Sequence, residues 1–81
     1  PSPAIELPAE AAARFAALRA WRAEAARAQN VPAYVIFHDA TLRGIAIESP
    51  RDLDALAGIG GVGASKLERY GREVIAALEA A

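Results

Sequence analysis

NVPAYVIFHDATLR, residues 30–43, contains the one run of this chain that could form a β-strand. That run is Tyr34–Phe37, whose β-branched and aromatic side chains favour extended backbone. A strand needs a neighbour for its backbone hydrogen bonds, and the sequence offers no second candidate nearby. Val31-Pro32 also ends any preceding helix, because the residue before a proline avoids helical backbone. We therefore expect a buried turn or a single helical turn at residues 33–37, within an all-α domain.

Upstream of this stretch the sequence predicts one long helix from Glu10 to Asn30. Alanine dominates the segment, and it is the strongest helix former. Asn30 suits the left-handed residue that ends many helices. Residues 1–8, PSPAIELP, hold three of the five prolines and are typical of a linker. The inner face is predicted from apolar spacings of three and four, which place Phe15, Leu18, Trp21, Arg22 and Ala25 on one stripe.

Downstream, the caps predict two shorter helices. Asp39 is expected to cap a helix from Ala40 to about Ile47, with Leu42, Ile45 and Ala46 facing inward. Ser49 is expected to cap the next helix, Pro50–Ala57, because proline favours the first helical position and Asp52 then lies in the first turn. This helix is expected to bury Leu53 and Leu56.

The segment Gly58–Gly63 has too many glycines for a helix or strand interior, so we predict a turn before a last helix, Ala64 to about Ala80. Gly61 and Gly63 would let the backbone approach a ligand, and the following helix start and Lys66 would favour a phosphate. The alternative is a tight interhelical turn that only packs Val62 into the core. The fold prediction is thus four main helices plus one short helical turn, in one domain at residues 9–81.

Length and composition limit what such a domain can be. The chain has 81 residues, no cysteine and no methionine, so it allows one small domain without disulfides or thiolate metal sites. Its hydrophobic fraction is 54%, but 22 of those residues are alanines, which bury little area. Close-packed helices around a few large side chains are the expected result.

The net charge of −1 argues against DNA binding driven by bulk charge, but the charges are unevenly placed. Residues 14–30 carry a local balance of +3, whereas residues 48–58 and residues 1–13 each carry −2. A modest basic face can therefore exist on a neutral molecule. A solvated amphipathic helix would show the same pattern.

Few side chains suggest chemistry. Tyr34 could stack on an unpaired base if it is exposed, or it could be a core tyrosine with its hydroxyl at the rim. Trp21 is expected to be mostly core. His38 and Asp39 lack the further ligands of a metal site, and no nucleophile–base set can be assembled. We expect no catalytic residue, metal or cofactor, and the segment Ala9–Ala28 carries too many charges to span a membrane.

Two longer motifs resemble the HRDC domain, the helicase-and-RNase-D C-terminal module. They are residues 30–43, NVPAYVIFHDATLR, and residues 56–71, LAGIGGVGASKLERYG. The resemblance covers about residues 12–80 in the same order and spacing. It is strongest to the copies in bacterial RecQ DNA helicases, some of which carry several HRDC domains in tandem, and this chain could be the last of such copies.

The resemblance implies a bundle of five helices with an accessory role in engaging single-stranded or branched DNA, and no activity of its own. The parent chain would be an ATP-dependent DNA helicase acting in the bacterial cytoplasm at the nucleoid, and the domain itself a monomer. The residues that correspond to the family's DNA-contacting positions are Tyr34, Arg19, Arg22, Lys66 and Arg69, together with Gly61 and Gly63 of the turn.

This sequence lacks the extra lysines that RecQ relatives often carry along the first helix. The near-neutral charge therefore leaves two alternatives open. The domain could dock on the helicase core or on a partner protein through an acidic face formed by Glu48, Asp52 and Asp54. It could also be the accessory domain of an RNase D-type exonuclease.

Overall fold

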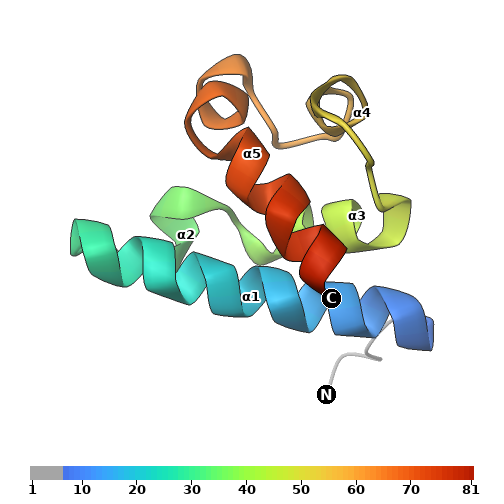
Figure 1. Cartoon of the computed structure of the whole chain (residues 1–81). Helices are drawn as coiled ribbons and strands as arrows, with labels where there is room; N and C mark the ends of the chain where they lie inside the picture. Colours follow the sequence, from blue (N-terminus) through green and yellow to red (C-terminus); the bar gives the residue numbers. More distant parts are fainter. Residues whose placement is uncertain (1–6) are drawn as a thin grey trace.

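The computed structural model describes residues 7–81 and shows an all-α architecture (Figure 1). The long helix α1 runs along one side of the molecule, and α2, α3 and α5 pack on it, while α4 packs on α5. Four main helices and one short helical turn were predicted, and this is confirmed. The first six residues of the expected linker lie outside the described part. The helices are α1 (Ala9–Gln29), α2 (Ala33–Ile36), α3 (Asp39–Glu48), α4 (Leu53–Ala57) and α5 (Ala64–Ala80).

Helix α1 ends as its sequence predicts. Asn30 adopts the left-handed conformation (φ 56°, ψ 47°), and its backbone N–H donates to the carbonyls of Ala26 and Arg27. Asparagine tolerates this conformation, which satisfies carbonyls that the helix end leaves free. Pro32 follows, so the chain leaves α1 and turns back toward it.

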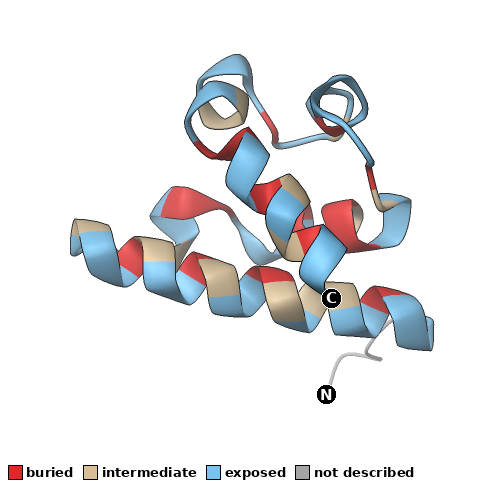
Figure 2. Ribbon diagram, viewed as in Figure 1, coloured by how far each residue is buried: buried red, intermediate tan, exposed pale blue. Residues whose placement is uncertain are grey.

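The core lies where α1, α3 and α5 meet (Figure 2). An aromatic cluster fills the part of it near α2: the ring of Trp21 lies 6.0 Å from that of Phe37 and 5.7 Å from that of Tyr70. The Trp21 indole N–H donates to Glu73 on α5 at 3.0 Å. These rings supply the bulk that alanine cannot, while the small alanine side chains let the helices approach. The fully buried large aliphatic side chains are Leu18, Ile36, Leu42, Ile45, Leu56 and Val74.

The strand-like run forms the single turn α2, as expected. Ile36 and Phe37 are buried in the core, and Tyr34 and Val35 are exposed. One turn of helix therefore divides an apolar run into an inner half and an outer half.

The starts of α3 and α4 differ from the expectation. Asp39 is the first residue of α3 and does not cap it, since its carboxylate binds Arg22 instead. Ser49 ends α3 in the left-handed conformation (φ 48°), and α4 begins only at Leu53. The cap of α4 is Asp52, whose carboxylate accepts the Ala55 N–H at 2.8 Å. Leu53, which was expected to be buried, lies at the rim with 37% of its surface exposed.

The glycine turn packs closely on α3. Gly61 has φ +90°, and a Cβ atom there would lie 2.2 Å from the Thr41 hydroxyl oxygen. Only glycine accommodates both this conformation and this approach. Val62 is buried, as expected if this turn packs on the core. Gly63 immediately precedes α5.

Candidate functional site

A surface cavity of about 210 Å³ lies between α2, the start of α3 and the glycine turn. Residues 34–38 and Thr41 line it from one side, and Gly61 and Lys66 line it from the other. Three of the residues singled out from the sequence, Tyr34, Gly61 and Lys66, thus come together although they are far apart in the chain. We call these residues and His38 the Tyr34 surface.

Tyr34 is the exposed aromatic side chain of this surface. It keeps 62% of its surface exposed, so the alternative of a core tyrosine is wrong. Its ring stacks on that of His38 with 6.1 Å between ring centroids and 21° between ring planes. Pro32 begins this turn, and the buried Ile36 and Phe37 anchor its far end. The ring is therefore held outward on a short, anchored element.

Lys66 is partly buried and held in place. Its ammonium group donates to the carbonyl of Val35 and lies 5.9 Å from the Phe37 ring centroid and 5.8 Å from that of Tyr70. Arg69, one turn later on α5, lies 5.5 Å from the Tyr70 ring centroid and donates to the Gln29 side chain at 3.1 Å. Two cations thus flank Tyr70, and the first of them reaches the Tyr34 surface.

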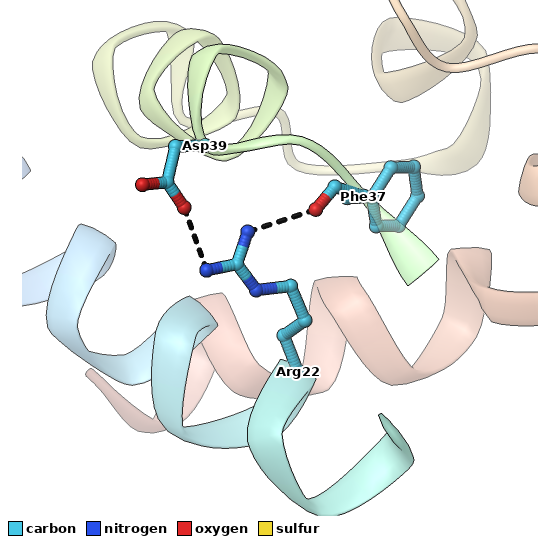
Figure 3. Close-up of polar contacts among 3 residues, drawn as sticks. All are labelled: Arg22, Phe37 and Asp39. Atoms are coloured by element: carbon cyan, nitrogen blue, oxygen red, sulfur yellow. Dashed lines mark hydrogen bonds and ion pairs between the residues drawn. The ribbon is translucent and has the colours of Figure 1, made fainter. Parts of the chain in front are cut away.

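Arg22 is not on an open basic face, which corrects the sequence expectation. Only 7% of its surface is exposed. Its guanidinium donates to the Phe37 carbonyl at 2.8 Å and to the Asp39 carboxylate at 2.6 Å (Figure 3). The hydrogen bond from Arg22 lowers the pKa of Asp39 below its ordinary value of 3.8, with help from the charges of Arg22, Arg19 and Arg43. Arg22 thereby fixes the link between α2 and α3.

Arg19 is exposed but lines a different depression. Its guanidinium lies 5.6 Å from the Phe15 ring centroid, and Arg43 lies 5.8 Å from the same ring. The groove beside Arg19 has a volume of about 460 Å³. Its other lining residues are Ala16, Ala20, Arg22 and Ala23 of α1 and Ala33 at the start of α2. The cavity of the Tyr34 surface includes neither Arg19 nor Gly63.

The three acidic residues expected on one face do not share a groove. Glu48 lines a groove of about 460 Å³ between α3 and α4. Asp52 lines another, of about 270 Å³, between α4 and α5, where Arg72 and Glu79 also lie. Asp54 is exposed on α4. A docking surface built on all three carboxylates would have to extend across two grooves.

His38 and Asp39, considered as a metal or hydrolytic pair, engage separate partners. His38 stacks on Tyr34, and Asp39 binds Arg22. Among residues 7–81 the side chains form no group of three or more His, Asp or Glu that could hold a metal ion. Within the same range, no helix combines the length and the apolar character needed to cross a membrane.

Two contacts of the site were not predicted from the sequence, namely the buried pairing of Arg22 and the stacking of His38 on Tyr34. Arg22 lies on the apolar stripe with Leu18, and an arginine at a core position must pair with buried acceptors. No spacing rule predicts the contact between His38 and Tyr34, because Phe37 and His38 have extended backbone and helical side-chain spacing does not apply there. For Arg22 the spacing favoured the inner stripe and the positive charge favoured the basic face, and the acceptors that the fold supplies decide for the inner stripe.

Comparison with known proteins places this geometry in a family. The sequence model of the HRDC domain matches residues 11–78. The chain is 53% identical over 58 residues to the ATP-dependent DNA helicase UvrD2 of Mycobacterium tuberculosis. This aligned region covers 72% of this chain and 8% of that protein. The chain is also 45% identical over 56 residues to the ATP-dependent DNA helicase RecQ of Pasteurella multocida. That aligned region covers 69% of this chain and 9% of that protein. The chain therefore spans less than a tenth of the length of these two relatives.

A solved structure has the same fold. The third HRDC domain of Deinococcus radiodurans RecQ superposes with a TM-score of 0.85 at 33% identity, over 89% of this chain and 95% of that one. The sequence pointed to RecQ, and the relatives add UvrD2 as a second class of helicase that carries a similar domain. Because the family match extends over most of the chain and the fold agrees with it, the chain belongs to the HRDC family.

Proposed function

We propose that this HRDC domain is a non-catalytic accessory domain of an ATP-dependent DNA helicase of the RecQ or UvrD2 type, which acts on DNA in the bacterial cytoplasm. In that chain it holds single-stranded or branched DNA weakly through the Tyr34 surface and so modulates unwinding. The observation that carries the proposal is the exposed Tyr34 ring, held at a cavity that Lys66 also lines. The relatives named above are helicases, which favours a helicase over an RNase D-type exonuclease as the parent.

The chemistry of the surface suits an unpaired strand. An exposed ring can stack on a base of any sequence, which contributes about 1–3 kcal/mol per base. Lys66 supplies a positive charge for a neighbouring phosphate, and Arg69 supplies a second one turn away. Gly61 presents bare backbone on the side of the cavity that Lys66 also lines. Base stacking and phosphate contacts of this kind hold a strand without reading its sequence.

The affinity of the isolated domain should be low. The whole chain carries a net charge of −1, and Arg22 is occupied inside the fold. Few phosphates can then be neutralised, and we expect dissociation constants in the range of non-specific binding, about 10⁻⁴–10⁻⁶ M or weaker. The domain would add to the affinity of the helicase core through their linkage rather than bind tightly alone.

The test is an anisotropy titration of labelled oligothymidylate and of a forked duplex, at 50 and 200 mM salt. Tyr34→Ala should weaken binding about tenfold, because one stacked base is lost. Tyr34→Phe should retain the affinity, because the ring remains. Lys66→Gln should reduce the salt dependence, with a slope smaller by about 0.7 on single-stranded DNA.

Arg51→Gln serves as the matched control, because Arg51 is exposed in a separate groove beside the end of α5. It should leave binding nearly unchanged. Equal effects of Arg51→Gln and Lys66→Gln, or no effect of Tyr34→Ala in the domain and in the full helicase, would exclude the Tyr34 surface as the site. If Glu48→Lys or Asp54→Lys then changed helicase activity, docking through the acidic residues would become the favoured role; Asp52 is left unchanged in this test because it caps α4.

A further inference from the structure

His38 is the second ring of the Tyr34 surface. It precedes α3 with extended backbone (φ −73°, ψ 155°), and its side chain makes no capping hydrogen bond to that helix. It is exposed, stacks on Tyr34 and lines the same cavity as Lys66. The imidazole therefore does not cap α3 and is accessible to a ligand that contacts Tyr34.

Imidazole chemistry adds something that the other groups of this surface do not have. Histidine changes its charge between about pH 5 and 8, and its protonated form donates from both ring nitrogens. His38 is the single histidine of the 81 residues. His38 is thus the one side chain of this surface that can carry a positive charge on an aromatic ring.

The titratable and charged groups around His38 come from four elements. Tyr34 on α2 stacks on it, Lys66 on α5 lies across the cavity, and Asp39 is its neighbour on α3. Arg22 on α1 binds Asp39 and keeps that carboxylate ionised at pH 5.5, because it holds the pKa of Asp39 below 3.8. The positive charge of Lys66 and the negative charge of Asp39 act on the imidazolium in opposite directions.

We propose that His38 is a DNA-binding residue of this domain, which forms one two-ring platform with Tyr34 and, when protonated, binds a phosphate of the strand that stacks on Tyr34. The inference rests on the proposed function and extends it. A base lies against the free face of the Tyr34 ring, and the adjoining phosphate lies against the imidazolium. Binding of single-stranded DNA then strengthens as the pH falls.

The size of the effect follows from counterion release. One additional phosphate contact on single-stranded DNA makes the salt slope steeper by about 0.7. The same contact raises the affinity by up to about eightfold at 50 mM salt and about threefold at 200 mM salt. Lowering the pH from 7.5 to 5.5 should therefore strengthen binding more at the lower salt concentration.

The experiment titrates labelled oligothymidylate with the domain at pH 5.5 and 7.5, each at 50 and 200 mM salt. The variants are His38→Phe, which keeps a ring without the charge, and His38→Ala, which removes both. We expect pH-dependent binding by the wild type, pH-independent binding by His38→Phe at the level of the wild type at pH 7.5, and weaker binding by His38→Ala at both pH values. Circular dichroism at both pH values checks that each variant is folded.

The outcomes separate the two proposals. If binding depends on Tyr34 but responds to pH equally in the wild type and in His38→Phe, the role of His38 is overturned and the proposed function stands. If the wild type binds equally well at pH 5.5 and 7.5, the role of His38 is likewise overturned and the proposed function stands. If the wild type does not bind, or if Tyr34→Ala binds as the wild type does, the proposed function fails together with this inference.

Discussion

Arg22 joins three segments of the chain with one guanidinium. It extends from α1 to the carbonyl of Phe37, the residue that follows α2, and to Asp39 at the start of α3 (Figure 3). Buried arginines occur where such acceptors are available, since an unpaired buried charge is costly. These contacts hold the residues on either side of His38. Arg22 therefore also determines where His38, and with it the stacked Tyr34 ring, is presented.

Arg22→Met should therefore destabilise the domain by about 2–3 kcal/mol. The substitution leaves the buried Phe37 carbonyl without its donor, and this penalty exceeds that of an exposed contact. Urea unfolding followed by circular dichroism measures the change. Arg27→Met is the matched control, because Arg27 pairs with Glu24 on the open surface of α1, and it should cost less than about 0.5 kcal/mol. Equal losses in the two variants would contradict the structural role of Arg22.

The ion pair of Asp39 should leave a signature in the pH dependence of stability. Its pKa is lowered in the folded state, so its contribution is present above 3.8, the ordinary value, and is lost as the pH falls through the lower folded value. Asp39→Asn should thus be less stable than the wild type at pH 5–7, and the difference should shrink below pH 3.8. Denaturant midpoints across this range measure it. A difference that stays constant down to pH 2.5 would show that the charge of Asp39 does not stabilise the fold.

At the scale of elements, the long helices were predictable and the connections were less so. Alanine content and apolar spacing set α1 and α5, and Asn30 marks the end of α1. Ser49 and Asp52 are both good caps, so sequence alone could not decide which of them starts α4. The position of Ser49 in the left-handed region, after the last turn of α3, decides it.

The candidate site shows the same division. The two motifs predicted Tyr34, Gly61 and Lys66 as site residues, and the structure places them around one cavity. A four-residue helix has no repeating face, so the sequence left the exposure of Tyr34 open. The burial of Arg22 depends on acceptors that only the folded chain brings near it.

Within the turn between α4 and α5, Gly61 is the glycine that leaves no room for a side chain. Gly61→Ala should destabilise the domain by about 2–4 kcal/mol, because it combines an unfavourable backbone conformation with a collision against Thr41. Gly60→Ala is the control, since a Cβ atom there meets nothing within 4 Å, and its effect should stay below about 1 kcal/mol. Thermal unfolding of both variants makes the comparison. Similar melting temperatures would show that the turn shifts to relieve the contact.

At the scale of the whole molecule, the radius of gyration is 12.0 Å, which is close to the roughly 11–12 Å expected for a compact chain of this length. Every long helix contributes to one core, and residues 7–81 form no second buried cluster that could unfold separately. A domain of this kind should unfold in one cooperative step.

We expect the isolated domain to be a monomer with a melting temperature that does not depend on its concentration. A folded dimer would be stabilised by mass action, so its melting temperature would rise with concentration. Thermal unfolding between about 5 and 500 μM, together with sedimentation, distinguishes the two. A rise of several degrees across this range would refute the monomer.

Trp21 gives the domain a built-in optical reporter. It is the single tryptophan of the chain, its indole is hydrogen-bonded to α5, and it lies against Phe37 and Tyr70. Its emission spectrum therefore senses the junction of α1, α5 and the link between α2 and α3. Loosening of any of these segments should shift that emission toward the red, so the cohesion of the bundle can be followed without attaching a dye.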